Sequence, residues 1–299
     1  MATTKIQAAP QTAKRSFSAG SVISAIGRWI VRNRIYLIAF AIPAVLTYLA
    51  YALFGLYPFG EESVLCLDLN GQYVYYFEAL RDAFWGDGSI FYNWSRNLSG
   101  EFMGIIGYYL ASPFTLIVML LPEKFMLSSL LIMQLCKLGA AGATFNYFLQ
   151  KRRGVQPYPS LLFSTMYAMM AYGVIQLIDP MWLDGLVFLP LIMLGIEYLV
   201  DDGRRLNFII PLALMCVANF YIGYMICFFV ILYFLFYLCF GSDKKRKGYD
   251  YFTAFVRIAY SSVIALACAA FMLLPVYNAL KLGKFEFTDP DYSFRFQSF

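Results

Sequence analysis

Residues 207–240 read NFIIPLALMCVANFYIGYMICFFVILYFLFYLCF and contain no charged side chain. About 20 apolar residues are enough to cross a bilayer as a helix. This stretch is too long for one crossing, so we expect two helices joined by a tight turn near 219–223, where asparagine and glycine favour chain reversal. The stretch therefore predicts a helical hairpin inside a membrane.

Six more apolar runs surround this hairpin, at 36–57, 104–121, 126–149, 160–177, 185–200 and 252–275. Hydrophobic residue types make up 61% of the 299 residues and charged types 14%. Soluble domains have about 45–50% apolar and about 25% charged residues. The composition therefore predicts an all-α polytopic membrane protein.

The residue types that are missing or scattered exclude several kinds of site. The sequence has no histidine, which excludes histidine acid–base catalysis and histidine metal ligands. The six cysteines form no C-x-x-C pair, and five of them lie in apolar runs, so they indicate neither a disulfide framework nor a zinc site. The net charge of +5 comes from clusters beside apolar runs, which indicates contact with the membrane surface rather than with nucleic acid.

Loop charges predict how the chain crosses the cell membrane. Basic residues precede the first run and follow the runs ending at 149, 200 and 240, whereas the other loops are rich in carboxylates. Because basic loops stay in the cytoplasm, we expect a cytoplasmic N-terminus. The alternation also requires that 104–121 does not cross, and Gly104, Gly107 and Pro113 suit a re-entrant or interfacial segment. About seven crossings remain.

This topology divides the chain into three parts. Residues 1–35 are the expected cytoplasmic tail, and 36–280 form the transmembrane domain with an extracytoplasmic loop at 58–103. Residues 281–299 are the expected outer segment, which ends as if the chain continued. Within the loop, Tyr73, Phe77, Leu80 and Phe84 recur at helical spacing, which predicts an amphipathic helix lying on the outer leaflet and ending at 86–88.

Two acidic clusters in the outer loops are candidate binding groups. Asp68 and Asn70 just precede the predicted helix, and one of them is a candidate N-cap. Asp68 is also a candidate reactive carboxylate, a role compatible with capping, with Glu61 and Glu62 as competitors for it. Asp179 and Asp184 flank Trp182, which is either a membrane-belt anchor or a stacking surface for a sugar ring. Asn219 and Tyr221 lie in the predicted hairpin turn, either as plain turn residues or as part of a polar site.

Lys137 is the charged residue deepest inside an apolar run. Such groups are costly in a membrane and usually face a polar cavity or a partner. Gln134 shares its helix face, and Gly139 and Gly142 indicate close helix packing nearby. We therefore expect this face to line an internal cavity.

Five motifs in order carry a resemblance to a known family. They are DLNGQYVYYFEALRD, YYLASPFTLI, LCKLGAAGATF, DPMWLDGLVFLPLIMLGIEYL and NFYIGYMICFFVILYF. Together they resemble the YfhO membrane proteins of Gram-positive bacteria, and such proteins resemble the GT-C class of membrane glycosyltransferases. The resemblance implies a polyprenyl-phosphate sugar donor and a cell-wall polymer acceptor such as lipoteichoic acid. It also implies a catalytic carboxylate in the first outer loop, which falls on Asp68, with Gln72 and Tyr73 beside it.

The resulting hypothesis is a multi-pass enzyme of the cell membrane. Asp68 removes a proton from the acceptor or holds a divalent cation, and Asp179, Trp182 and Asp184 hold the sugar. Arg81 or Lys137 faces the phosphate, and Asn219 and Tyr221 complete the binding site. A transporter or flippase of lipid-linked saccharides, or a non-enzymatic envelope assembly factor, would fit the same composition.

Overall fold

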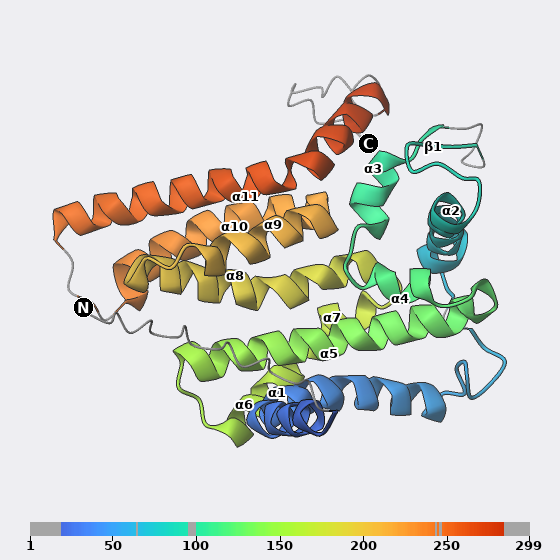
Figure 1. The fold of residues 1–299 in the computed structure, drawn as a ribbon, viewed down its shortest axis with the longest axis horizontal. Helices are drawn as coiled ribbons and strands as arrows, with labels where there is room; N and C mark the ends of the chain where they lie inside the picture. Colours follow the sequence, from blue (N-terminus) through green and yellow to red (C-terminus); the bar gives the residue numbers. More distant parts are fainter. Residues whose placement is uncertain (1–18, 64, 95–99, 243, 245–246, 284–299) are drawn as a thin grey trace, which may run out of the picture.

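Six helices lie side by side and form a bundle (Figure 1). The computed structural model describes residues 19–63, 65–94, 100–242, 244 and 247–283, so most of the expected tail and outer segment lies outside the described residues. The bundle helices are α1 (Ala19–Leu53), α5 (Met126–Arg152), α8 (Leu183–Asp202), α9 (Leu206–Ala218), α10 (Phe220–Phe236, continued by η5, Tyr237–Gly241) and α11 (Gly248–Gly283).

Within the described residues, five helical segments have the length and composition to cross a membrane. They are Ser24–Leu53, Glu123–Arg152, Pro180–Asp202, Phe220–Gly241 and Gly248–Lys281. The other two expected crossings consist of shorter helices: α9, and the broken pair α6 (Pro157–Ala168) and α7 (Ala171–Ile175). The fold is therefore an all-α multi-pass arrangement, and the number seven stays a prediction.

The hairpin expected from 207–240 is confirmed. Helices α9 and α10 are joined by Asn219 alone and pack against each other. A side chain at Gly223 would meet the Cα of Cys216 at 3.0 Å, which shows how closely the two helices approach beside the turn. Asn219 caps α10, because its Oδ1 accepts a hydrogen bond of 2.8 Å from the backbone N–H of Ile222.

The two ends of the bundle differ in chemistry. At one end, which we call the basic end, Arg152 at the end of α5 and Arg153 just after it bind the buried carboxylate of Glu197 on α8, at 2.8 and 2.5 Å. Arg152 also pairs with Asp201, which accepts a hydrogen bond of 2.6 Å from the hydroxyl of Tyr237. This network ties α5, α8 and the end of α10 together. The opposite end carries Asp68 and Asp179 and is called the carboxylate end.

The run 104–121 is broken, as the sequence predicts. It contains α3 (Met103–Ile105), the π-helical turn η2 (Ile106–Leu110) and α4 (Thr115–Leu120), and each is far shorter than a membrane crossing needs. The 3₁₀ turn η3 (Glu123–Phe125) then leads into α5. The broken segment lies across the carboxylate end of the bundle (Figure 1).

The loop 58–103 contains the expected helix but not in the expected setting. It holds the π-helical turn η1 (Leu69–Tyr73), α2 (Val74–Trp85) and a short antiparallel pair, β1 (Tyr92–Asn93) and β2 (Gly100–Glu101). Tyr73, Phe77 and Leu80 are buried in a cluster with Phe102, Ile105 and Leu130, whereas Phe84 is 64% exposed. The apolar face of α2 therefore packs on protein, and the prediction that it lies on the outer leaflet is wrong.

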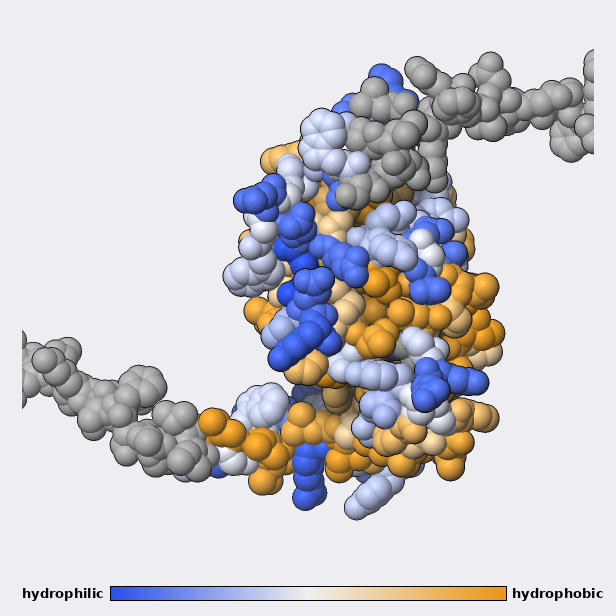
Figure 2. Space-filling view, turned by 90° about the vertical axis from the view of Figure 1, so that its right-hand side faces the viewer, coloured by the Kyte–Doolittle hydropathy of each residue, from blue (hydrophilic) through white to orange (hydrophobic). Residues whose placement is uncertain are grey.

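The carboxylate end presents both polar and apolar side chains to the viewer in Figure 2. Hydrophilic residues gather along one side of this face, next to a hydrophobic area. Such a mixed surface can contact water and lipid at once, as expected at a membrane boundary.

Candidate functional site

Five side chains from three parts of the chain form two adjacent hydrogen-bonded groups at the carboxylate end. Tyr73 donates its hydroxyl hydrogen to Asp179 Oδ1 at 3.0 Å. Tyr109 donates to Gln72 Oε1 at 3.3 Å, and Gln72 Nε2 lies 3.5 Å from Asp68 Oδ1. Asp68 and Asp179, which are 111 positions apart in the sequence, therefore belong to one site.

Aromatic rings extend this site into a continuous wall. The ring of Tyr109 lies 5.1 Å from that of Tyr73, 4.9 Å from that of Tyr76 and 4.7 Å from that of Tyr108. Tyr108 lies 5.9 Å from Tyr221, and Tyr221 lies 6.3 Å from Trp182. We call these rings together with Asp68, Gln72 and Asp179 the aromatic site. Flat rings beside carboxylates can stack on a sugar and accept its hydroxyl hydrogens.

Asn219 connects the segment that carries Tyr108 to the start of α10, which carries Tyr221. Its Nδ2 donates a hydrogen bond of 2.7 Å to the backbone carbonyl of Tyr108, while its Oδ1 caps α10. Asn219 is fully buried, so both of its bonds are shielded from water. The broken segment that carries Tyr108 is thereby fixed against the α9–α10 turn that carries Tyr221.

Helix α5 holds the chain on both sides of Asp179. Gln134 Nε2 donates a hydrogen bond of 2.6 Å to the carbonyl of Leu177, and Lys137 Nζ donates one of 2.7 Å to the carbonyl of Pro180. Residues three apart share a helix face, so the two side chains reach the same loop. The loop conformation that places Asp179 and Trp182 therefore depends on α5.

Lys137 and Asp184 form an ion pair inside the protein. Lys137 Nζ lies 2.8 Å from Asp184 Oδ2, and the side chains are 1% and 0% exposed. The other carboxylate oxygen of Asp184 accepts a hydrogen bond of 2.8 Å from Ser112 Oγ. The expectation that this face of α5 lines a cavity is wrong, because Asp184 and two backbone carbonyls occupy it. Neither Lys137 nor Asp184 can touch a substrate in this conformation.

Burial controls the protonation of the groups around Asp179. It raises the pKa of the Asp179 carboxyl above its ordinary value, and the nearby charge of Asp68 adds to the rise, while the hydrogen bond from Tyr73 opposes it. Burial also raises the pKa of Tyr109 to about 12 and raises the pKa of Tyr73 well above its ordinary value. Both tyrosines therefore keep their hydroxyl hydrogens at neutral pH and act as donors.

Trp182 carries a polar group that the described residues leave without a partner. Its indole Nε1 is buried, and no acceptor among the described groups reaches it. Buried N–H groups are rarely left unpaired, because an unmade hydrogen bond costs about 1–3 kcal/mol. A bound ligand or water with an oxygen at this point would complete the site.

Of the residues proposed from the sequence, seven come together and three do not. Asp68, Gln72, Tyr73, Asp179, Trp182, Asn219 and Tyr221 belong to the aromatic site or brace it. Lys137 and Asp184 lie behind it as the buried pair. Arg81 is elsewhere: its Nη1 donates to the carbonyls of Val118, Met119 and Leu121 and so binds the end of α4. Asp68 occupies the N-cap position of η1, as one alternative predicted, but its side chain makes no capping hydrogen bond there.

Sequence reasoning missed the residues that connect these elements. Tyr108, Tyr109 and Ser112 lie in the broken run and in the motif YYLASPFTLI, but the sequence predicts no binding or bracing role for them. Tyr108 and Tyr109 shortly precede Ser112 and Pro113, in a run too irregular to cross a membrane. This combination was the signal in the sequence for a polar role. Nothing in the sequence links Ser112 to Asp184.

The aromatic site does not fit a metal ion held by protein ligands alone. Across the described ranges, no group of three or more cysteine, aspartate or glutamate side chains is close enough to hold a metal. Divalent cations such as Mg²⁺ require about six oxygen ligands, and the site offers the carboxylates of Asp68 and Asp179. These two carboxylates alone do not complete such a ligand shell.

The bundle and the aromatic site together define a class: a multi-pass membrane protein with a polar, aromatic-lined site at one end of its helices. The family model described as bacterial membrane protein YfhO matches residues 39–299, and the chain belongs to this family.

One similar curated protein is "Uncharacterized protein YfhO" of Bacillus subtilis (strain 168). It is 27% identical over 168 residues, which cover 50% of this chain and 19% of the relative. The chain thus spans about a fifth of the relative's length. No solved structure matches the chain.

Proposed function

We propose that the protein is a membrane glycosyltransferase of the GT-C type. It would transfer a sugar from a polyprenyl-phosphate donor to a cell-wall polymer, such as lipoteichoic acid, on the outer face of the cell membrane. The observation that supports this most strongly is the aromatic site, in which two carboxylates meet a wall of tyrosine and tryptophan rings.

The reaction requires one proton transfer and one displacement. Asp68 accepts the proton of an acceptor hydroxyl, the hydroxyl oxygen bonds to the anomeric carbon of the donor sugar, and the bond from that carbon to the phosphate oxygen breaks. The polyprenyl phosphate leaves with the electron pair and needs no added proton, because phosphate is a stable anion. A positioned carboxylate base typically contributes about 100- to 10,000-fold.

The other residues bind and orient the sugar. Trp182 and Tyr221 offer ring faces, and the unpaired indole N–H of Trp182 is placed to donate to a sugar or phosphate oxygen. Asp179 accepts a hydrogen bond from Tyr73 and stands near Asp68, so it can hold a sugar hydroxyl or share the acceptor proton. Lys137 and Asp184 support these residues from behind without touching the substrate.

The proposed membrane orientation follows from the same arrangement. The basic end faces the cytoplasm, because basic loops are retained there, and the carboxylate end faces outward. The shorter α9 and the α6–α7 pair complete seven crossings in this proposal. A transporter is disfavoured, since transporters place polar binding groups near the bilayer midplane and the deep pair Lys137–Asp184 is closed.

The test is transfer of a radiolabelled sugar from a polyprenyl-phosphate donor to cell-wall polymer by the full-length protein in membranes. The Asp68→Asn variant is expected to lose at least about 100-fold of the activity, because the amide is not a base. Glu61→Gln is the matched control, since Glu61 is an exposed carboxylate of the same loop outside the aromatic site. Wild-type activity of Asp68→Asn, in protein shown to be folded and inserted, would refute the proposal.

A further inference from the structure

The first turns of α1 leave the side of the bundle. Figure 1 shows these turns, in dark blue, nearly end-on, whereas the later turns of α1 run along the other helices. Figure 2 shows the same segment in profile at the lower left, where it projects from the body of the molecule. Residues 24–32 are all exposed, so no other part of the described chain covers this segment.

A contact with α5 places this segment near the basic end. The ring of Tyr36 lies 5.5 Å from that of Tyr147, and Lys151 Nζ lies 5.7 Å from the centre of the same Tyr147 ring. The residues before Tyr36 therefore lie close to the basic residues that end α5. Residues 36–53 of α1 span about 27 Å, at about 1.5 Å per residue, which suits one bilayer crossing. The preceding turns are thus not needed for the crossing.

This segment has two sides of different chemistry. Ile26, Trp29 and Ile30 follow the i, i+3, i+4 spacing and so share one side of the helix. Arg28 and Arg32 are four residues apart and share the other side. The three apolar residues are 53%, 55% and 46% exposed, which is unfavourable in water. A helix of this kind is stable when it lies parallel to a membrane surface with its apolar side among the lipids.

The charge of the segment selects the kind of membrane surface. Arg28, Arg32 and Arg34 lie within two helical turns, and no acidic residue occurs between positions 19 and 36. Across the described ranges, no carboxylate pairs with these arginines. Their guanidinium groups can therefore bind phosphate oxygens. A second copy of the chain on this helix would bring three more arginines beside them, which charge repulsion disfavours.

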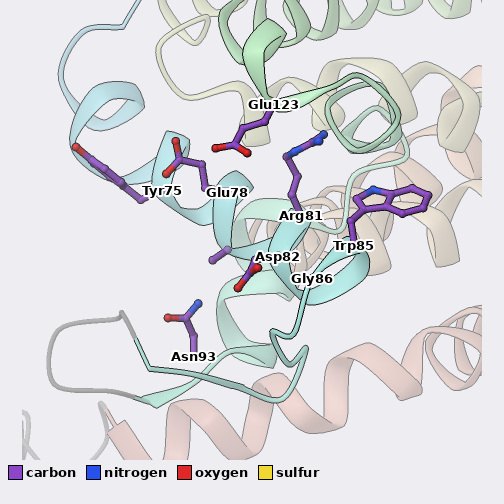
Figure 3. A pocket seen from close by; sticks show the side chains of 9 residues that line it. Tyr75, Glu78, Arg81, Asp82, Trp85, Gly86, Asn93 and Glu123 are labelled. Carbon is purple, nitrogen blue, oxygen red and sulfur yellow. The ribbon is translucent and has the colours of Figure 1, made fainter.

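The opposite end of the bundle has the contrary charge. Glu78, Asp82 and Glu123 line a pocket of about 540 Å³ against α2 (Figure 3). Arg81 is the basic residue of this lining, and its Nη1 binds backbone carbonyls of α4. Carboxylates repel anionic headgroups, so charge directs anionic lipid to the basic end rather than to the carboxylate end.

We propose that residues 24–34 of α1 bind anionic phospholipids in the leaflet at the basic end. Ile26, Trp29 and Ile30 insert among the lipid chains, while Arg28 and Arg32 bind headgroup phosphates. Each arginine close to an anionic surface strengthens binding by about fivefold. The inference goes beyond the proposed function, because lipid binding here requires neither sugar transfer nor an assignment of the basic end to the cytoplasm.

The test is hydrogen exchange, followed by mass spectrometry, on the full-length protein in nanodiscs that hold a single copy. Exchange of the backbone amides of residues 24–34 is compared in discs of phosphatidylcholine alone and in discs that also contain phosphatidylglycerol. We expect exchange to be at least about fivefold slower with phosphatidylglycerol. The difference should shrink in about 1 M salt, where the Debye length is only about 3 Å. Residues 36–53 should exchange equally in both discs and serve as the internal reference.

Paired variants separate lipid binding from a folding defect. Arg28→Gln with Arg32→Gln preserves helix propensity and is expected to remove most of the dependence on phosphatidylglycerol. Arg204→Gln with Arg205→Gln is the matched control, because it removes two exposed arginines from the same end of the bundle but outside α1. This control should keep the full dependence.

Several results would overturn the proposal. Equal exchange of residues 24–34 in the two kinds of disc would exclude selective binding of anionic lipid. Full dependence in the Arg28→Gln, Arg32→Gln variant, or the same loss in the control variant, would exclude these arginines as the ligands. Protection by inorganic phosphate in phosphatidylcholine discs would assign them to free phosphate. Protection that appears only in discs with two copies would assign the apolar side to a second copy of the chain.

Discussion

Replacing Lys137 by methionine tests the buried ion pair that supports the aromatic site. Lys137 gives hydrogen bonds to Asp184 at 2.8 Å and to the Pro180 carbonyl at 2.7 Å, and both charged side chains are excluded from solvent. Methionine has a similar length but cannot donate. Removing one member of a buried pair typically destabilises a protein by about 3–5 kcal/mol, because the remaining charge stays buried without compensation.

A double variant tests whether the loss of stability in Lys137→Met comes from the unpaired charge of Asp184. Replacing Asp184 by leucine together with Lys137→Met removes both charges, and such apolar replacements are often close to neutral. The double variant still lacks the donor to Pro180, a loss of about 1–3 kcal/mol. We therefore expect it to be more stable than Lys137→Met, yet still impaired in transfer, since the loop that carries Asp179 and Trp182 is no longer held from α5.

The assay is unfolding by a denaturing detergent, followed by circular dichroism, with transfer activity measured on the same preparations. Lys124→Met is the control, because Lys124 is an exposed lysine just before the same helix and should leave the free energy of unfolding unchanged. Wild-type stability of Lys137→Met, or a double variant less stable than both single variants, would show that the pair does not contribute as argued.

The remaining predictions concern single contacts. Tyr73→Phe removes the hydrogen bond that lowers the pKa of Asp179, so the pKa of this carboxyl rises further. We expect the acid limb of the pH–rate profile for transfer to move to higher pH. A limb at the wild-type pH, or at a lower pH, would contradict this role of Tyr73. Asn219→Ala loses the α10 cap and the bond to Tyr108 and should cost at least about 1–2 kcal/mol in detergent unfolding, whereas Asn219→Ser keeps the cap and should cost less; equal losses would exclude the capping role. Arg81→Gln should lower stability by about 1.5–3 kcal/mol while the KM for the donor stays constant; a raised KM with unchanged stability would restore Arg81 as a substrate ligand.

The sequence predicts the helices and the hairpin because these depend on local patterns. The apolar runs, the Asn219 turn and the stripe on α2 each lie within a few turns of chain, and each is found in the structure. The prediction is wrong for Phe84, which has the spacing of the apolar stripe but lies beyond the protein surface that covers Tyr73, Phe77 and Leu80.

The aromatic site was only partly predictable because its members are paired across long distances. Acidic and aromatic residues between the apolar runs led to Asp68, Asp179 and Trp182 as candidates, and the structure brings these three to the same end of the bundle. Which of them are exposed depends on partners that no local pattern specifies, such as Ser112 for Asp184 or the α4 carbonyls for Arg81. Tyr109 binds Gln72 and contacts the ring of Tyr73, yet it lies in a segment whose sequence shows no helical or strand periodicity.

The pairing of Lys137 with Asp184 has a consequence for biogenesis. The two residues are 47 positions apart, so the lysine of α5 is synthesised and delivered to the membrane before its counter-ion exists. A lysine at the centre of a nascent segment opposes insertion by about 2.5–3.5 kcal/mol, and the span containing α5 has the lowest mean hydropathy of the five. We therefore expect α5 to be fully stabilised in the bilayer only after α8 has been synthesised, so the aromatic site assembles once that later helix arrives.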